Sequence, residues 1–93
     1  MTEGQLVVTG DLEFEQRREF IATTTGVIAR AEGNIELDCS QLDAIDEATL
    51  GMLVVLSRAA SRRGARLVLE RPSPRVRSDL ETAAVSHMFD WSV

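Results

Sequence analysis

The sequence contains no lysine, one histidine, one cysteine and no long apolar run. Without about 18 consecutive apolar residues it has no candidate transmembrane helix, and its first residues lack the charged and apolar pattern of a secretion signal. A lone cysteine, Cys39, cannot form an internal disulfide. Its place in an apolar pattern of period two predicts a small buried thiol. We therefore expect a cytoplasmic protein that does not insert into the membrane.

Residues that usually perform catalysis or bind metals are also scarce. His87 lies beside Phe89 and Trp91, with no paired carboxylate or second metal ligand evident. The acidic residues at positions 38–47 lack the spacing and the glycine of a calcium loop, so solvated loop charges are the favoured interpretation. No glycine-rich phosphate loop occurs. We expect that the protein is not an enzyme and binds no metal or cofactor.

The length and composition are those of one small globular domain. The chain has 93 residues, of which 44% are hydrophobic and 27% charged, outside the range of disordered chains. A chain of this length builds one core, so we assign residues 1–93 to a single domain. The formal net charge of −5 disfavours binding to the phosphate backbone of nucleic acids.

The charges are unevenly distributed along the chain. Residues 1–47 hold 11 acids and 3 bases, whereas residues 48–93 hold 4 acids and 7 bases. All ten bases are arginine. This usage is more typical of a GC-rich genome than of a phosphate-binding surface, which is the alternative interpretation.

Alternating strand and helix patterns predict an α/β fold. Ile35, Leu37 and Cys39 alternate with Glu36 and Asp38, which is the period of a strand with one apolar face. Apolar residues at helical spacing follow and precede this strand, and glycine or proline separates the segments. We predict strands at residues 5–9, 35–39 and 66–70, and helices at residues 13–31, 47–63 and 75–86. The strand, helix, strand order indicates parallel crossover connections.

The central stretch combines a strand, a loop and a capped helix. Ser40 and Asp43 supply turn chemistry after the strand. Asp46 precedes an unbroken helical run, where its carboxylate can accept the free amide hydrogens of the first turn.

Residues 37–51 resemble the core motif of STAS domains, the family of anti-sigma factor antagonists and sulfate-transporter tails. The matching positions are Leu37-Asp38-Cys39-Ser40, Leu42, Ile45-Asp46 and Leu50-Gly51. Residues 8–13 are similar to the Thr-Gly-Glu-Leu-Asp of the family, and residues 73–80 extend the likeness. The resemblance implies a STAS-like mixed sheet of three to four strands with helices packed mainly on one face. Relative to the family, the chain is short at both ends and largely lacks the final strand and helix.

The sequence departs from the family at its phosphorylation site. The family's phosphorylated Ser or Thr corresponds to Ala48, with Glu47 at the preceding hydroxyl position and Thr49 in place of a glycine. A methyl group cannot accept a phosphoryl group, so no phosphorylation is expected at Ala48. Phosphorylation of Thr49 is a minor alternative.

The resemblance implies a surface that binds a protein partner. The implied contact residues are Asp46, Glu47, Ala48, Thr49, Leu50 and, near the same tip, Glu13. An equally weighted alternative is that the acidic ones only stabilise the start of a helix, where negative charge is favoured.

Two functions remain open from the sequence. One is a bacterial regulator of transcription that binds a kinase-type anti-sigma factor without the usual phosphorylation switch. The other is a small STAS subunit of an ABC-type lipid transport assembly that contacts its ATPase, which needs no phosphoserine. A weak homodimer is also expected, because the strand at residues 5–9 lacks the usual flanking strand and would lie near an open sheet edge.

Overall fold

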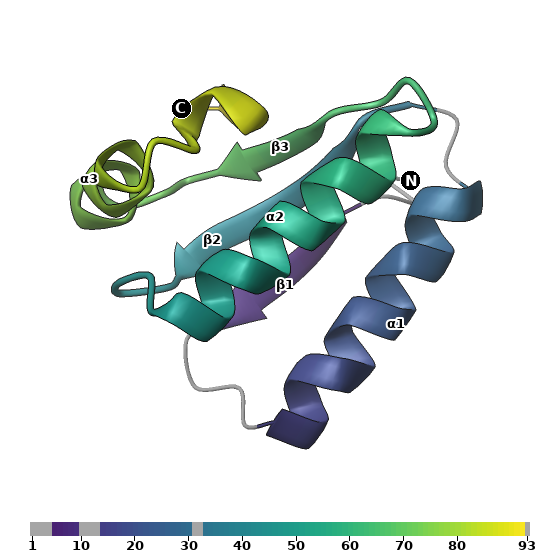
Figure 1. Ribbon diagram of the computed structural model, residues 1–93, viewed down its shortest axis with the longest axis horizontal. Helices are drawn as coiled ribbons and strands as arrows, with labels where there is room; N and C mark the ends of the chain where they lie inside the picture. The colour runs from purple at the N-terminus through teal and green to yellow at the C-terminus, as the bar shows by residue number, and fades with distance from the viewer. Residues whose placement is uncertain (1–4, 10–13, 31–32, 93) are drawn as a thin grey trace.

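A computed structural model describes residues 5–9, 14–30 and 33–92 of the chain. Strands and helices alternate along it, and a short 3-10 turn precedes the last strand (Figure 1). In chain order the elements are β1 (Gln5–Thr9), α1 (Phe14–Arg30), β2 (Ile35–Gln41), α2 (Glu47–Ser61), β3 (Leu67–Glu70), α3 (Pro74–Thr82), η1 (Ser86–Met88) and β4 (Asp90–Ser92). The predicted elements are all present, with ends that differ by a few residues.

The four described strands form one sheet in the order β1-β2-β3-β4, and every neighbouring pair is parallel. Leu37 of β2 lies opposite Leu6 on one side and Leu69 on the other. The predicted α/β class and strand number are confirmed. One detail differs, because the described sheet is parallel and not mixed. Each of its strands is joined to the next by a helical segment, and such crossover connections return the chain in the same direction.

Alternate residues of β2 differ in burial, so the two faces of the sheet have different environments. Ile35, Leu37 and Cys39 are fully buried, whereas the alternate positions Glu36 and Asp38 are only half-buried. β3 repeats this pattern. A sheet with helices on both faces would bury both sets. The half-buried second set therefore agrees with helices packed mainly on one face, as predicted.

The three helices contribute to one apolar core. Figure 1 shows α2 in front of the sheet with α1 beside it, and α3 at the left, near the end of β3. Leu53 and Leu56 of α2 and Val76 and Leu80 of α3 are fully buried in the same cluster as the strand residues. α1 contributes Ile28 at 3% exposure. α2 is therefore buried along one whole side, and its first turn is held at a fixed place on the sheet.

The chain after α3 differs from the prediction. The helix ends at Thr82 and not at residue 86, and Ala83 and Ala84, which the predicted helix included, are exposed. Ala84 has a φ of 61°, and the amide of Val85 donates to the Leu80 carbonyl 3.1 Å away. This is a Schellman-type helix end with alanine where glycine is usual.

The last residues are a part of the sheet. The sequence was expected to lack most of a final strand, but β4 pairs with β3 from Val68 to Glu70. Phe89, just before β4, is 2% exposed in the core. The expectation of a missing final strand was wrong, because the three-residue strand is too short to show an alternating pattern of its own.

Candidate functional site

The candidate site lies where β2 ends and α2 begins. In a parallel sheet the carboxyl ends of the strands meet at one edge, where loops collect the residues that contact ligands and partners. Here the loop at residues 42–46 joins the two elements. Leu42 is 2% exposed and its amide donates to the Cys39 carbonyl at 3.0 Å. The loop is thus anchored in the core at its first residue.

Asp46 caps α2 as the sequence predicts. Its backbone is extended (φ −92°, ψ 175°), and its Oδ1 accepts the amide hydrogen of Thr49 at 2.7 Å. The Thr49 N–H, together with the Thr49 hydroxyl and the more distant charge of Arg17, holds the pKa of Asp46 below its ordinary value. The cap therefore keeps a charged carboxylate at the exposed start of the helix.

The predicted contact residues divide into an exposed and a covered group. Asp46, Glu47 and Ala48 are exposed. Thr49 is 5% exposed, and Leu50 is half-buried. A helix turns about 100° per residue, so the exposed methyl group of Ala48 and the side chain of Thr49 point in different directions. Glu13, the sixth predicted residue, lies outside the described residues.

An ion pair joins the end of β2 to the segment after β3. Arg71 Nη2 lies 2.7 Å from Asp38 Oδ2, and the amide of Ser40 donates to Asp38 Oδ1 at 2.9 Å. The hydrogen bond from Arg71, followed by those from Ser40, lowers the pKa of Asp38 to about 2. Arg71 has a φ of 52°, a left-handed conformation that non-glycine residues rarely adopt. The pair fixes one side of the site.

A second contact joins the loop to α3. The amide of Ile45 donates to Asp79 Oδ2 at 2.9 Å, across 34 positions of sequence. Neither Asp79 nor Arg71 was predicted from the sequence as part of the site, because no local pattern relates them to it. The one signal in the sequence that could have suggested them is their location, Arg71 just after a strand and Asp79 on the next helix. The Asp38–Arg71 pair thus holds the end of β2, and Asp79 holds the last part of the loop that follows it.

Among the described residues, few groups could act as a nucleophile or hold a metal ion. Burial, followed by the charges of Asp38 and Glu70, raises the pKa of the Cys39 thiol to about 12, so it is not a nucleophile at neutral pH. Within the described ranges no three His, Cys, Asp or Glu side chains gather in a group that could hold a metal ion. Among the described helices, none combines the length and apolar character that a bilayer crossing requires. What the candidate site presents is a set of exposed side chains at the start of α2, Asp46, Glu47 and Ala48.

Comparisons with known proteins place this fold in a family. The model of a family described as "Mlab, STAS domain" matches residues 2–90. No curated protein matches the chain. The structure is similar to that of an anti-sigma factor antagonist, TM1081, from Thermotoga maritima, with a TM-score of 0.76 and 18% identity over 97% of this chain and 80% of that one. It is also similar to the anti-sigma factor antagonist SpoIIAA in its unphosphorylated form, with a TM-score of 0.74 and 18% identity over 100% of this chain and 84% of that one.

Identities this low establish the shared fold only, but the family match covers nearly the whole chain and agrees with the motif at residues 37–51. The chain belongs to the STAS domain family.

Proposed function

We propose that this domain is a protein-binding regulator that docks on a kinase-type anti-sigma factor through the start of α2. The observation that carries the proposal is the exposure of residues 46–48 at the start of α2, after a loop held by Asp79 and a strand end held by the Asp38–Arg71 ion pair. A loop already held in one conformation loses little entropy when a partner binds. The fold shared with solved anti-sigma factor antagonists supports this class of partner.

The chemistry of the tip suggests what it would contact. Asp46 and Glu47 present two carboxylates, and the methyl group of Ala48 lies beside them. Asp46 keeps its charge because the Thr49 amide holds its pKa low. We expect a partner surface with arginine or lysine opposite these carboxylates and a shallow apolar contact for Ala48.

Phosphorylation is not expected to regulate this contact. Ala48 has no hydroxyl, and Thr49 is 5% exposed with its amide bound to Asp46. A kinase would have to unwind the first turn of α2 to reach the Thr49 oxygen. Binding through this tip would therefore be constitutive.

The lack of a phosphorylation site at the tip also favours a second candidate function. A small STAS subunit of an ABC-type lipid transport assembly would rest on its ATPase without being released by phosphorylation. The absence of an exposed hydroxyl at positions 47–49 suits a permanent subunit at least as well as a switch protein. The identity of the captured ATPase or kinase distinguishes the two candidates.

The interface is tested by charge reversal at the tip. The protein captures its partner from native lysate, the partner is identified by mass, and the dissociation constant is then measured with purified components. The Asp46→Arg, Glu47→Arg double variant should weaken binding by about tenfold or more, because two charge pairs become repulsive. The Glu81→Arg variant, which changes an exposed acid on α3, is the control. Undiminished binding by the double variant would show that the tip is not the interface.

Since Asp46 is also the helix cap, one further variant separates folding from contact. Asp46→Asn keeps the cap and removes the charge. It should unfold at nearly the unchanged temperature and still bind more weakly. A loss of binding only in variants that lose stability would argue against a direct contact.

The absence of a switch is tested by incubation with the partner and ATP. The unmodified protein should gain no phosphoryl group, and an Ala48→Ser variant should gain one if the partner is a kinase of the anti-sigma type. Mass spectrometry of the intact chains measures both. Stoichiometric phosphorylation of Thr49 in the unmodified protein would overturn the constitutive interpretation.

A further inference from the structure

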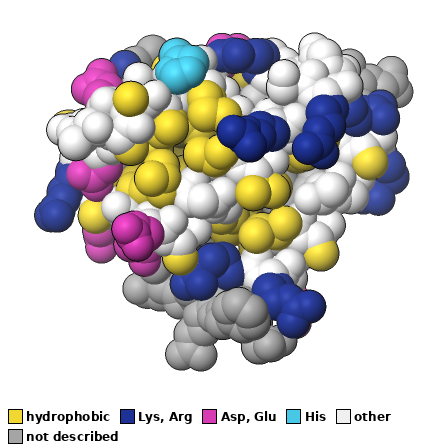
Figure 2. All heavy atoms as spheres, viewed as in Figure 1, with side chains coloured by type: hydrophobic (Ala, Val, Ile, Leu, Met, Phe, Trp, Pro, Cys, Tyr) yellow, Lys and Arg dark blue, Asp and Glu magenta, His cyan; other side chains and the backbone are white. Residues whose placement is uncertain are grey.

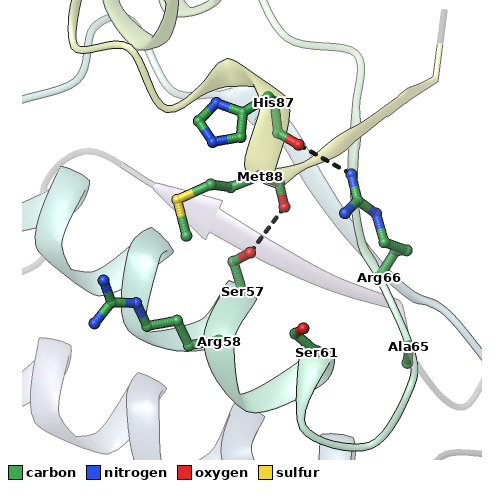
Figure 3. Close-up of a pocket in the computed structure, with 7 residues that line it drawn as sticks. All are labelled: Ser57, Arg58, Ser61, Ala65, Arg66, His87 and Met88. Carbon is green, nitrogen blue, oxygen red and sulfur yellow. Dashed lines mark hydrogen bonds between the residues drawn. The ribbon is translucent and has the colours of Figure 1, made fainter.

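A small cavity lies at the other end of α2 from the tip. It has a volume of about 200 Å³ and is bounded by the last turns of α2, the two residues just before β3 and the η1 turn. Figure 3 shows Arg58 and Arg66 on opposite sides, Ser61 below, and His87 and Met88 above. α2 has 15 residues, which at about 1.5 Å per residue separates this cavity from Asp46 by about 20 Å. It is therefore distinct from the candidate partner surface.

Arg66 is held in a fixed orientation at the rim. Its Nε lies 3.1 Å from Asp90 Oδ1, its Nη2 donates to the His87 carbonyl at 3.1 Å, and its backbone amide donates to Asn34 Oδ1 at 2.9 Å. A guanidinium has five N–H donors, so these contacts leave further donors available. Figure 3 shows the group turned toward the centre of the cavity. The positive charge is thus positioned before any ligand arrives.

The two serines have different roles. The hydroxyl of Ser57 donates to the Met88 carbonyl at 2.8 Å, so it is used in closing the wall between α2 and η1. Ser61 lies one helical turn further on the same side of α2 and is exposed. Its hydroxyl can donate to a ligand in the cavity.

The surroundings are strongly basic. Residues 48–69 contain no acid and four arginines, at positions 58, 62, 63 and 66, all of them exposed. One of these arginines, Arg66, forms an ion pair with Asp90. Figure 2 shows dark-blue arginine side chains over α2 beside the hydrophobic area between α2 and η1. An anion approaching this end meets a net positive surface.

The carbonyl groups at the end of α2 repel an anion less strongly than those of a helix C-terminus without capping hydrogen bonds would. The amide of Arg62 donates to the Arg58 carbonyl at 3.1 Å, and the amide of Ala65 donates to the Ala60 carbonyl at 3.0 Å. These bonds engage carbonyl groups that would otherwise repel negative charge.

We propose that this cavity binds a phosphate-type oxyanion. Ser61 and Arg66 line it with donors, and Arg58, whose guanidinium points away from the cavity in Figure 3, is exposed and long enough to turn toward a bound group. Several donors and positive charges suit a tetrahedral group with several acceptor oxygens. Guanidinium groups pair with phosphate through parallel hydrogen bonds, and a phosphate carries more charge than a carboxylate. The volume accommodates a phosphate group with a few attached atoms, and is smaller than the about 300–1,000 Å³ of sites that enclose a whole cofactor.

The test is a titration of the isotope-labelled protein with inorganic phosphate, followed by amide chemical shifts at constant ionic strength. Saturable shifts are expected at residues 57–66 and 87–88, and sodium chloride should not reproduce them. Arg58→Gln and Ser61→Ala should each weaken binding by about fivefold or more, because each removes one donor to a charged group. Arg63→Gln removes an arginine that does not line the cavity and should change the affinity less than about twofold.

Arg66→Gln is measured as well, together with its unfolding temperature, because it also breaks the pair with Asp90. Equal weakening by Arg63→Gln and Arg58→Gln, or shifts that follow ionic strength alone, would overturn the proposal in favour of a diffuse basic surface.

A second arm identifies the source of the phosphate. Sedimentation with vesicles of phosphatidylglycerol in phosphatidylcholine tests a lipid head group, and a soluble phosphomonoester such as glycerol phosphate tests a metabolite. Binding of either that is weakened by Ser61→Ala supports the cavity and names the source. Vesicle binding that is unaffected by Ser61→Ala, without any response to free phosphate, would contradict it.

Discussion

Asp38 uses both oxygens of its carboxylate at the carboxyl end of β2. One accepts from the amide of Ser40 and the other pairs with Arg71, and its side chain is 15% exposed. The family motif places an aspartate here, and this structure assigns it a positioning role. It holds the segment after β3 against the loop that leads to α2.

The pH dependence of stability tests this role. The pKa of Asp38 is about 2 in the folded chain, below the ordinary value of about 3.9. A lowered folded pKa contributes stability above pH 4 and loses it progressively as pH falls from about 4 to about 2. Asp38→Asn should reduce the free energy of unfolding at pH 7 by about 1 kcal/mol, a value discounted for the exposed Arg71 partner. The difference should shrink toward pH 2, as measured by urea unfolding.

Asp43→Asn, a change at an exposed acid of the same loop, is the control. A deficit of Asp38→Asn that is equally large at pH 7 and pH 2 would mean that packing, and not charge, explains it.

Structural features that depend on neighbouring residues in the chain are predictable from the sequence. The cap at Asp46, the buried Cys39 and the strand alternation from Ile35 all follow from local patterns, and all are present. The contact of Asp79 with the loop and that of Arg71 with Asp38 of β2 were not predictable, because each connects positions more than 30 residues apart. Such contacts depend on how α3 and β3 are placed by the core.

Among the elements, α3 shows why local signals can also mislead. A helix to residue 86 was expected from the apolar spacing of Val76, Leu80, Ala83 and Ala84. The chain instead turns at Ala84 in a left-handed conformation, with the amide of Ala84 donating to the Glu81 carbonyl at 2.9 Å. The turn brings Val85 and Met88 toward the core, and β4 follows. Packing of these apolar residues offsets the unfavourable backbone.

Ala84→Gly should therefore stabilise the protein. The Cβ of Ala84 disfavours a φ of 61°, and the residue is exposed, so glycine loses no packing there. We expect a gain of about 0.5–1 kcal/mol in the free energy of unfolding. Thermal unfolding should shift upward by a few degrees. Ala83→Gly, at an ordinary φ of −79°, is the matched control and should bring no gain. Equal effects of the two changes would show that the conformation of Ala84 is not the cause.

α3 also supports the candidate partner surface through Asp79. Asp79→Ala leaves the half-buried amide of Ile45 without its acceptor, which costs about 1–3 kcal/mol. We expect faster hydrogen exchange at Ile45 and weaker partner binding. Asp79→Asn retains an acceptor oxygen and should preserve both. Glu81→Ala changes an exposed acid of the same helix and should alter neither. Unchanged exchange at Ile45 in Asp79→Ala would remove the positioning role.

At the scale of the molecule, α2 separates two surfaces of opposite charge. Its first turn carries Asp46 and Glu47, and its last turns with the following residues carry the four arginines. This arrangement reflects the charge asymmetry of the sequence, whose acids are concentrated before residue 48. The fold places the two surfaces at opposite ends of one helix, which periodicity alone could not establish.

The position of β1 leads to a prediction about self-association. β1 is an end strand of the described sheet and pairs with β2 on one side. We expect a weak homodimer that forms by pairing of this edge with a second copy, and sedimentation at high protein concentration measures it. Val7→Pro should weaken the dimer, because proline removes a backbone donor. Circular dichroism and the unfolding temperature check that this variant remains folded.

Salt distinguishes this edge pairing from the other association that the molecule allows. Two copies could also join head to tail, the acidic start of α2 in one against the arginines of the other. That contact would be screened as the salt concentration rises from 0.05 to about 0.5 M, whereas backbone pairing along β1 would persist. A dimer that dissociates in salt and is insensitive to Val7→Pro, but is lost in Glu47→Arg, would place the contact at the ends of α2. A strict monomer under all conditions would exclude both modes, leaving the ends of α2 to other ligands.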